Sequence, residues 1–345
     1  MLRESCVPVK AIVSSLTLLA VVTFVFSLTL GSVHYAPAEV IEVLRNRLTG
    51  SPVNDPSVDA VVWQLRAPRG LLALIVGAGL ALAGVLMQTL VRNPLADPYL
   101  LGVSSGASVG ATAVITFGVF SGIYALAIGA LLGAVVATAC VFFVAMIQGG
   151  LTPLRLILAG VVLSSAFSAM ASFLVFKSSD ARAAQSVMFW MLGSVSGAQW
   201  NKLLLPLVMI IAGSILAVVI SRPLDAMVAG PDTAASLGVR VELLRNVLFL
   251  AQAALVGIMV AVAGGIGFVG LIIPHLARML VGSIHRRVIP VAMALGAVFL
   301  LWVDIIARVV VAPQEIPLGV VTGLIGAPLF LFIMGRGTYR FGGQA

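Results

Sequence analysis

The residues best able to bind another molecule are a few arginines near the ends of apolar segments. Arg66 and Arg69 stand three apart in the segment LRAPR, so both would share one face of a helix. They fit two roles equally well: cations that extend to water from the end of a buried segment, or a docking point for an acidic partner. Arg308 follows Asp304 by four residues, and this spacing favours an ion pair within one helix.

Motifs of the common ATPases and hydrolases are absent from the sequence. None of the three lysines, Lys10, Lys177 and Lys202, follows a glycine, so there is no phosphate loop of the form G-x-x-x-x-G-K-[ST]. There is no H-E-x-x-H segment and no paired-cysteine motif, and the three histidines stand apart, each more typical of a structural residue than of a haem ligand. The sequence therefore predicts a protein that is not an enzyme and has no cofactor of its own.

The elements that carry these arginines are long apolar segments. Of the 345 residues, 61% are hydrophobic and only 9% are charged, whereas about 25% of the residues in soluble domains are charged. A helix needs about 20 apolar residues to cross a membrane. The segments predict an all-α integral membrane protein with about ten transmembrane helices, at residues 11–33, 70–91, 99–153 (two helices), 156–176, 203–221, 246–263, 267–281, 288–303 and 316–335.

Three segments are predicted to interrupt this series of spans. Residues 38–48 have the spacing of an amphipathic surface helix. Residues 183–201 contain two tryptophans among glycines and serines, which is typical of a short interfacial or half-inserted helix. The run Gly-Gly-Ile-Gly at 264–267 is dense enough in glycine to break a helix.

The basic residues predict the orientation in the membrane. Ten crossings put both termini on one side, and that side holds twelve of the 20 Lys and Arg residues while the other holds eight. Because cytoplasmic loops carry an excess of Lys and Arg, both termini are expected in the cytoplasm. The net charge of +8 follows the ends of the spans, so it indicates membrane topology and not nucleic-acid binding.

Two parts of the chain resemble each other at an offset of 180 residues. The two matching spans are expected to run in opposite directions, which is the pattern of an inverted repeat. The chain is then one transmembrane domain, 1–345, with repeat halves at about 63–176 and 243–335. Chance similarity in an apolar chain is the alternative. The matches are Val76, Gly77, Ala81, Ala83, Gly84 and Pro94 with Val256, Gly257, Ala261, Ala263, Gly264 and Pro274.

Residues 222–245 belong to the longest polar insertion on the predicted cytoplasmic side. Pro231, Asp232 and Thr233 favour the start of a short helix with Asp232 as its N-cap, and Gly238 favours its end. A short helix on the inner face of a membrane protein is best explained by a contact with another protein. A soluble ATPase would provide such a contact.

Seven segments, spread over nearly the whole chain, resemble the permease subunits of iron-chelate and cobalamin importers, the FecCD/BtuC-type family of type II ABC importers. Each segment alone would be weak evidence, but their combination is highly specific. The segments are LRAPR (65–69), LVRNPLADPYLLGVSSGA (90–107), RLILAG (155–160), FWMLGS (189–194), AASLGV (234–239), GGIGFVGLIIPHLAR (264–278) and LGVVTGLIGAPLF (318–330).

The resemblance implies a BtuC-like homodimer in the cytoplasmic (inner) membrane of a bacterium, with a transport pathway between its subunits. It implies two cytoplasmic ATPase subunits, which would bind ATP and Mg, and an extracytoplasmic binding protein. Residue by residue, it assigns docking of the binding protein to Arg66, Arg69 and Arg308. It assigns coupling to the ATPases to Asp232, Ala234, Ala235, Leu237 and Gly238. It assigns the cytoplasmic gate to Pro153 and Leu154.

The expected cargo is an iron chelate, either a siderophore complex or haem, because such importers are the more numerous members of the family. A cobalamin importer is the alternative. Cobalamin permeases often have small hydroxyl residues at the gate, and Pro153 and Leu154 depart from that pattern. An ion-driven secondary transporter would need ionisable groups near the membrane centre, and an intramembrane enzyme would need a polar catalytic cluster; the spans contain neither.

Overall fold

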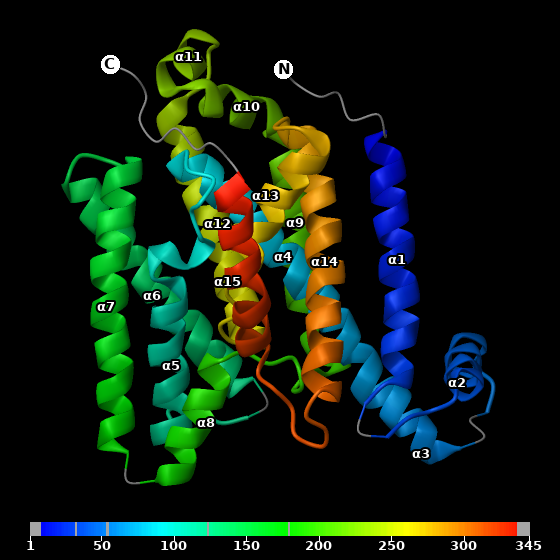
Figure 1. Ribbon diagram of the computed structural model, residues 1–345. Coiled ribbons are helices and arrows are strands. Elements are labelled where there is room, and N and C mark those ends of the chain that lie inside the picture. Colours follow the sequence, from blue (N-terminus) through cyan, green and yellow to red (C-terminus); the bar gives the residue numbers. More distant parts are fainter. Residues whose placement is uncertain (1–7, 32, 53–54, 123, 179, 337–345) are drawn as a thin grey trace.

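The computed structural model describes residues 8–336, except 32, 53–54, 123 and 179, and these residues form helices and connections without any strand (Figure 1). Seven helical segments are long and apolar enough to cross a membrane, and three shorter apolar helices accompany them. Together they agree with the predicted number of about ten. They are α1 (Val9–Thr29), α4 (Ala67–Val91, continuous with α3, Pro56–Asp59, and the π-helix η1, Ala60–Arg66), α5 (Val103–Phe117), α6 (Ala125–Ile147), α7 (Pro153–Lys177), α9 (Leu204–Val219), α12 (Val241–Ala263), α13 (Val269–Val281), α14 (His285–Val309) and α15 (Leu318–Arg336).

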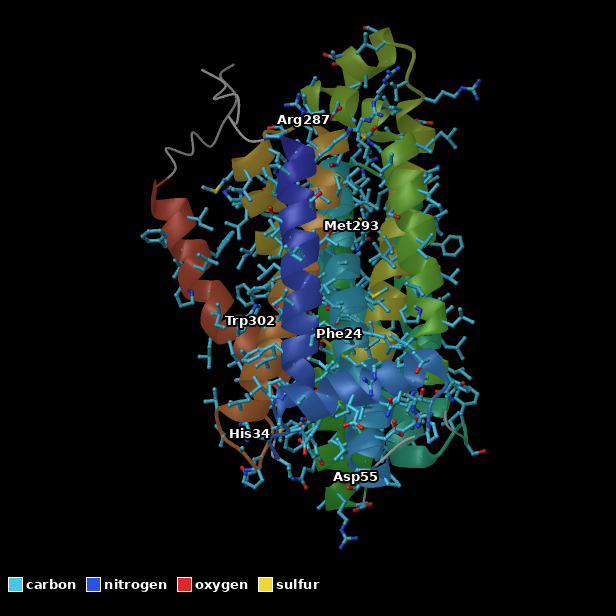
Figure 2. All side chains as sticks on the ribbon, turned by 90° about the vertical axis from the view of Figure 1, so that its right-hand side faces the viewer. Phe24, His34, Asp55, Arg287, Met293 and Trp302 are labelled. Atoms are coloured by element: carbon cyan, nitrogen blue, oxygen red, sulfur yellow. The ribbon has the colours of Figure 1, made fainter. Side chains whose placement is uncertain are left out.

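The short helices lie at the two ends of the bundle. The end that we call the upper end, as in Figure 1, carries α10 (Ser221–Ala229) and α11 (Pro231–Ser236). The lower end carries α2 (Pro37–Thr49), α3 (Pro56–Asp59) and α8 (Ala181–Met191). The first and last described helices, α1 and α15, begin and end at the upper end. Figure 2 shows the same polarity: Arg287 lies at the upper end, and His34 and Asp55 lie at the lower end.

Helix α4 is the centre of the bundle. Most of its side chains are buried, and it packs against α9, α12, α13 and α14. Two glycine contacts make this packing close: a Cβ atom at Gly77 would overlap the carbonyl oxygen of Gly296, and one at Gly84 would overlap that of Gly270. In a membrane, where helices gain little from excluding water, such close backbone contact is a main source of association. Helices α1, α6, α7 and α9 are largely exposed and apolar, as expected for surfaces that face lipid or a second subunit.

The predicted interruption at Gly-Gly-Ile-Gly is confirmed. Helix α12 ends at Ala263, Gly264 adopts φ 69° and ψ −165°, and α13 begins only at Val269. A side chain at Gly264 would also collide with the carbonyl oxygen of Trp190, which follows from the close approach of α8. Glycine is therefore needed here both for backbone conformation and for space.

The structure has a helix in each of the two segments that were predicted to carry short surface or interfacial helices, and their depth in the membrane stays a prediction. The segment expected at 38–48 is α2, which ends at Gly50 in the left-handed conformation. The segment expected at 183–201 contains α8 and a 3₁₀ turn at Trp200–Lys202. Trp200 lies against Trp63, with 4.7 Å between ring centroids, and donates a hydrogen bond to the Trp63 carbonyl oxygen. This aromatic contact therefore packs the connection between α8 and α9 against the start of the α4 span.

Helices α4 and α12 run in opposite directions, since α4 ends at the upper end and α12 begins there. An inverted repeat requires this arrangement. The repeat itself, with halves at about 63–176 and 243–335, stays a prediction.

Candidate functional site

The three arginines singled out in the sequence lie together at the lower end. Arg66 and Arg69 are at the start of the long α4 span, and Arg308 is in the last turn of α14. Each is 6–8% exposed. We call these arginines, with Asp304 and Glu315, the arginine network. Because the guanidinium groups are buried, each must have partners within the protein.

Asp304 is the centre of the network and is fully buried. Its Oδ1 accepts a hydrogen bond of 2.8 Å from Arg69 Nε, and its Oδ2 lies 3.1 Å from Arg308 Nη2. The predicted pair of Arg308 with Asp304 is therefore present. Arg69 Nη1 also donates a 2.7 Å bond to Glu315, whose side chain is 43% exposed. Asp304 and Glu315 are partners that the sequence analysis did not assign to Arg69, because they lie more than 230 residues away in the chain.

Arg66 and Arg308 also bind the backbone at the C-terminal end of α1. Arg66 donates to the carbonyl oxygens of Leu28, at 2.7 Å, and Val33, and its guanidinium lies 5.0 Å from the Tyr35 ring centroid. Arg308 Nη1 donates to the carbonyl oxygen of Leu30 at 3.2 Å. Carbonyl groups at a helix C-terminus lack partners within the helix and carry partial negative charge, so cations there are favourable. Arg69 and Arg308 pair with the two carboxylates, whereas Arg66 has only carbonyl oxygens and a ring as partners among the described residues, so the network has an excess positive charge.

The residues assigned to coupling lie at the opposite, upper end. Ala234 is fully buried, whereas Leu237 is 69% exposed. Gly238 ends the segment with φ 82°, and nothing lies within 4 Å of the place where its Cβ would be. Leu237 and Gly238 therefore form an open surface at the upper end.

The prediction that Asp232 is the N-cap of this helix is wrong. The N-cap of α11 is Gly230, and Asp232 lies inside the first turn. The reason is Pro231, whose fixed φ suits the first helical position and places the start one residue earlier. The predicted end at Gly238 agrees with the structure, because α11 ends at Ser236 and Leu237 is its C-cap.

An open groove of about 630 Å³ lies beside α11, between α10 and the start of α12. Most of the residues that line it are apolar, and two are arginines. Its lining includes Arg222, Pro223, Leu237, Arg240, Leu243 and Leu244.

The two residues assigned to the gate begin α7 at the upper end. Pro153 is the first residue of the helix, where its missing N–H costs nothing. Leu154 is 66% exposed on the isolated chain. A small polar pocket of about 230 Å³ lies next to this turn and is lined by Gly149, Gly150, Thr152, Glu242 and Arg245, among others.

Comparisons with known proteins agree on one family. Residues 18–336 match the FecCD transport family. The chain is 40% identical over 319 residues to the molybdate import permease MolB of Haemophilus influenzae, which covers 92% of this chain and 94% of MolB. It is 36% identical over 325 residues to the iron(3+)-hydroxamate import permease FhuG of Bacillus subtilis (92% and 94%). It is 39% identical over 329 residues to the vitamin B12 import permease BtuC of Klebsiella pneumoniae (94% and 93%).

A solved structure of an ABC transporter has the same fold as this chain. A metal-chelate type ABC transporter in an inward-facing conformation superposes with a TM-score of 0.83 at 39% identity, covering 95% of this chain and all of that chain. The apolar helices and these similarities lead to one conclusion: the chain is a multi-pass membrane protein that belongs to the FecCD family of ABC importer permeases.

Proposed function

We propose that this permease moves an iron chelate, a siderophore complex or haem, across the cytoplasmic membrane. The observation that carries the proposal is family membership, together with relatives that import iron hydroxamate and a metal-chelate type structural neighbour. The energy comes from partner ATPases, and the chelate arrives on a binding protein. The exposed apolar helices support pairing with a second copy, with the pathway between the two copies and Pro153 and Leu154 as its cytoplasmic gate.

Two other cargoes have support from relatives, cobalamin and molybdate. Uptake into cells that depend on this permease distinguishes them. We expect uptake of labelled ferric hydroxamate or haem to require the permease, and uptake of labelled cyanocobalamin and molybdate to be independent of it. Permease-dependent uptake of either of the latter two, without uptake of iron, would replace the iron proposal.

The upper end is the cytoplasmic end in this proposal. Both termini then lie in the cytoplasm, and the lower end faces outward. Reporter fusions test this: one at Arg340 should give a cytoplasmic signal, and one within residues 50–60 should give an external signal. Signals from the same side would contradict the proposed number of crossings.

The arginine network is proposed to dock the binding protein through exchange of carboxylates. Glu315 covers Arg69 from the exposed side, while Asp304 holds it from within. An acidic residue of the binding protein can take the place of Glu315 without exposing Asp304. The excess positive charge of the network favours this exchange, and screening by salt over about 8–10 Å weakens it.

This model of docking predicts that Glu315→Gln increases the affinity of the permease for the binding protein, because the Glu315 carboxylate no longer competes for Arg69. An exposed pair contributes about 0–1 kcal/mol, so the affinity gain should be up to about fivefold. The measurement is binding-protein affinity for the assembled complex at two salt concentrations. Glu42→Gln is the control, since it removes the same charge from α2 at the same end. Equal affinities for wild type and Glu315→Gln would contradict the exchange.

Coupling to the ATPases is proposed for the segment 222–245, in which Leu237 and Gly238 are exposed. Gly238→Trp should uncouple the complex, because the backbone at φ 82° disfavours a side chain and the bulk would fill the contact surface. Transport and ATPase retention on the purified permease are the measurements. Gly50→Trp is a matched control: Gly50 also has positive φ and no neighbour within 4 Å, but it lies at the lower end. Normal transport by Gly238→Trp would exclude this contact.

A further inference from the structure

A chain of hydrogen bonds at the upper end joins three helices. Asp225 of α10 accepts two bonds through Oδ1 from His285, the first residue of α14: 2.6 Å from Nδ1 and 2.9 Å from the backbone N–H. His285 Nε2 lies 2.8 Å from the hydroxyl of Thr89, in the last turn of α4. His285 and Thr89 are 4% and 2% exposed. The sequence alone predicts only a structural role for His285 and no role for Asp225 or Thr89.

The hydrogen-bonding capacity of these groups fixes the role of each. An ionised Asp225 only accepts, so His285 Nδ1 carries a proton. In the neutral ring Nε2 is then an acceptor, which requires Thr89 to donate. The Thr89 hydroxyl has a second acceptor, the carbonyl oxygen of Val85 at 2.9 Å. Thr89 therefore ties α14 to α4 when its single proton points to His285 and not to Val85.

Helices α4 and α14 are joined at two more levels. Near the middle, Gly77 and Gly296 bring the two backbones into direct contact. At the lower end, Arg69 of α4 is bonded to the fully buried Asp304 of α14. Contact at three levels opposes sliding and separation of the two helices, because packed interfaces do not deform continuously. The pair therefore behaves as one rigid unit, from the coupling segment to the arginine network.

We propose that the α4–α14 unit carries the signal between the binding protein and the ATPases, and that His285 is the positioning residue that attaches α10 to it. This inference rests on the proposed function. When an ATPase displaces α10, the two bonds of Asp225 move the start of α14. The Thr89 bond makes α4 follow, and the displacement reaches Arg69 and Asp304 at the outer end. In the reverse direction, docking outside shifts the coupling segment inside.

The test uses the whole complex with its ATPases and binding protein, reconstituted in liposomes. ATP hydrolysis is measured without binding protein and with binding protein loaded with ferric hydroxamate, haem, cyanocobalamin or molybdate, whichever it retains. Three variants each remove a defined hydrogen bond. His285→Asn keeps a nitrogen near Nδ1 and loses the Thr89 bond. His285→Gln keeps a nitrogen near Nε2 and loses the side-chain bond to Asp225, while the backbone bond to Asp225 remains. Thr89→Val removes the hydroxyl.

We expect all three variants to keep basal ATP hydrolysis and to lose stimulation by the binding protein by about fivefold or more, the usual range of coupling between sites. The double variant of His285→Asn with Thr89→Val should be no worse than either single variant, because both cut the same bond. Arg287→Gln, an exposed change in the same turn, should keep full stimulation.

Three results would overturn the inference in different ways. Full stimulation in His285→Asn and Thr89→Val, with loss only in His285→Gln, would mean that Asp225 merely anchors the start of α14. A wild-type complex whose ATP hydrolysis ignores the loaded binding protein would overturn the proposed function as well. Wild-type stimulation with unchanged variants would leave the proposed function intact and remove only the signal route.

Discussion

Replacing Gly84 with leucine should abolish folded protein. A Cβ atom at this position would overlap the backbone carbonyl of Gly270 in α13, and its next nearest neighbours are backbone atoms of the same residue. Backbone cannot give way as a flexible side chain can, so α4 and α13 must separate. Overpacking typically costs about 1–3 kcal/mol and more where the site cannot relax. The total stability of a protein is only about 5–15 kcal/mol.

The effect should already be large for Gly84→Ala, which adds one methyl group. We expect a lower yield of monodisperse protein in detergent and a clearly lower Tm. Gly257→Ala in α12 is the matched control, because its nearest neighbours are side-chain carbon atoms at 3.6–3.9 Å, an ordinary van der Waals distance. Alanine there should be neutral or stabilising by up to about 1 kcal/mol, the difference in helix propensity. A wild-type Tm for Gly84→Ala would show that α4 and α13 are not packed this closely.

The glycines illustrate which parts of the fold could be predicted from the sequence. The apolar segments predicted the transmembrane spans, because each crossing requires about 20 apolar residues, whichever helices they pack against. The glycine run before Val269 gave the break, because glycine alone tolerates the conformation of Gly264. Which glycine meets which helix could not be predicted. The partner of Gly84 lies in α13, and no local pattern encodes a contact across the bundle.

The candidate site also has one part that the sequence predicts and one part that it does not. The pair of Asp304 and Arg308 is encoded locally, at a spacing of four residues. The bonds from Arg69 to Asp304, and from Arg66 to the end of α1, depend on three helices that meet at the lower end. Sequence spacing therefore identified the arginines but not their burial. Their burial changes the docking hypothesis, since Glu315 becomes the group that a partner can displace.

Asp304→Asn should be among the most destabilising single changes at the lower end. The side chain keeps its shape and loses its charge, so the buried Arg69 and Arg308 lose the carboxylate between them. Removing one partner of a buried ion pair typically costs about 3–5 kcal/mol, because the remaining charge stays desolvated. We expect a large fall in Tm and in the yield of folded protein.

Glu315→Gln is the control within the same network. It removes one carboxylate from Arg69, but its side chain is 43% exposed, so water can replace it and the cost should stay within about 0–1 kcal/mol. Stability and docking can also be separated. A triple variant with Arg69→Met, Asp304→Leu and Arg308→Met replaces the buried charges by apolar groups and should recover much of the lost Tm. This variant should not bind the binding protein, because it lacks two of the arginines proposed for docking. Equal Tm values for Asp304→Asn and Glu315→Gln would contradict the buried, central position of Asp304.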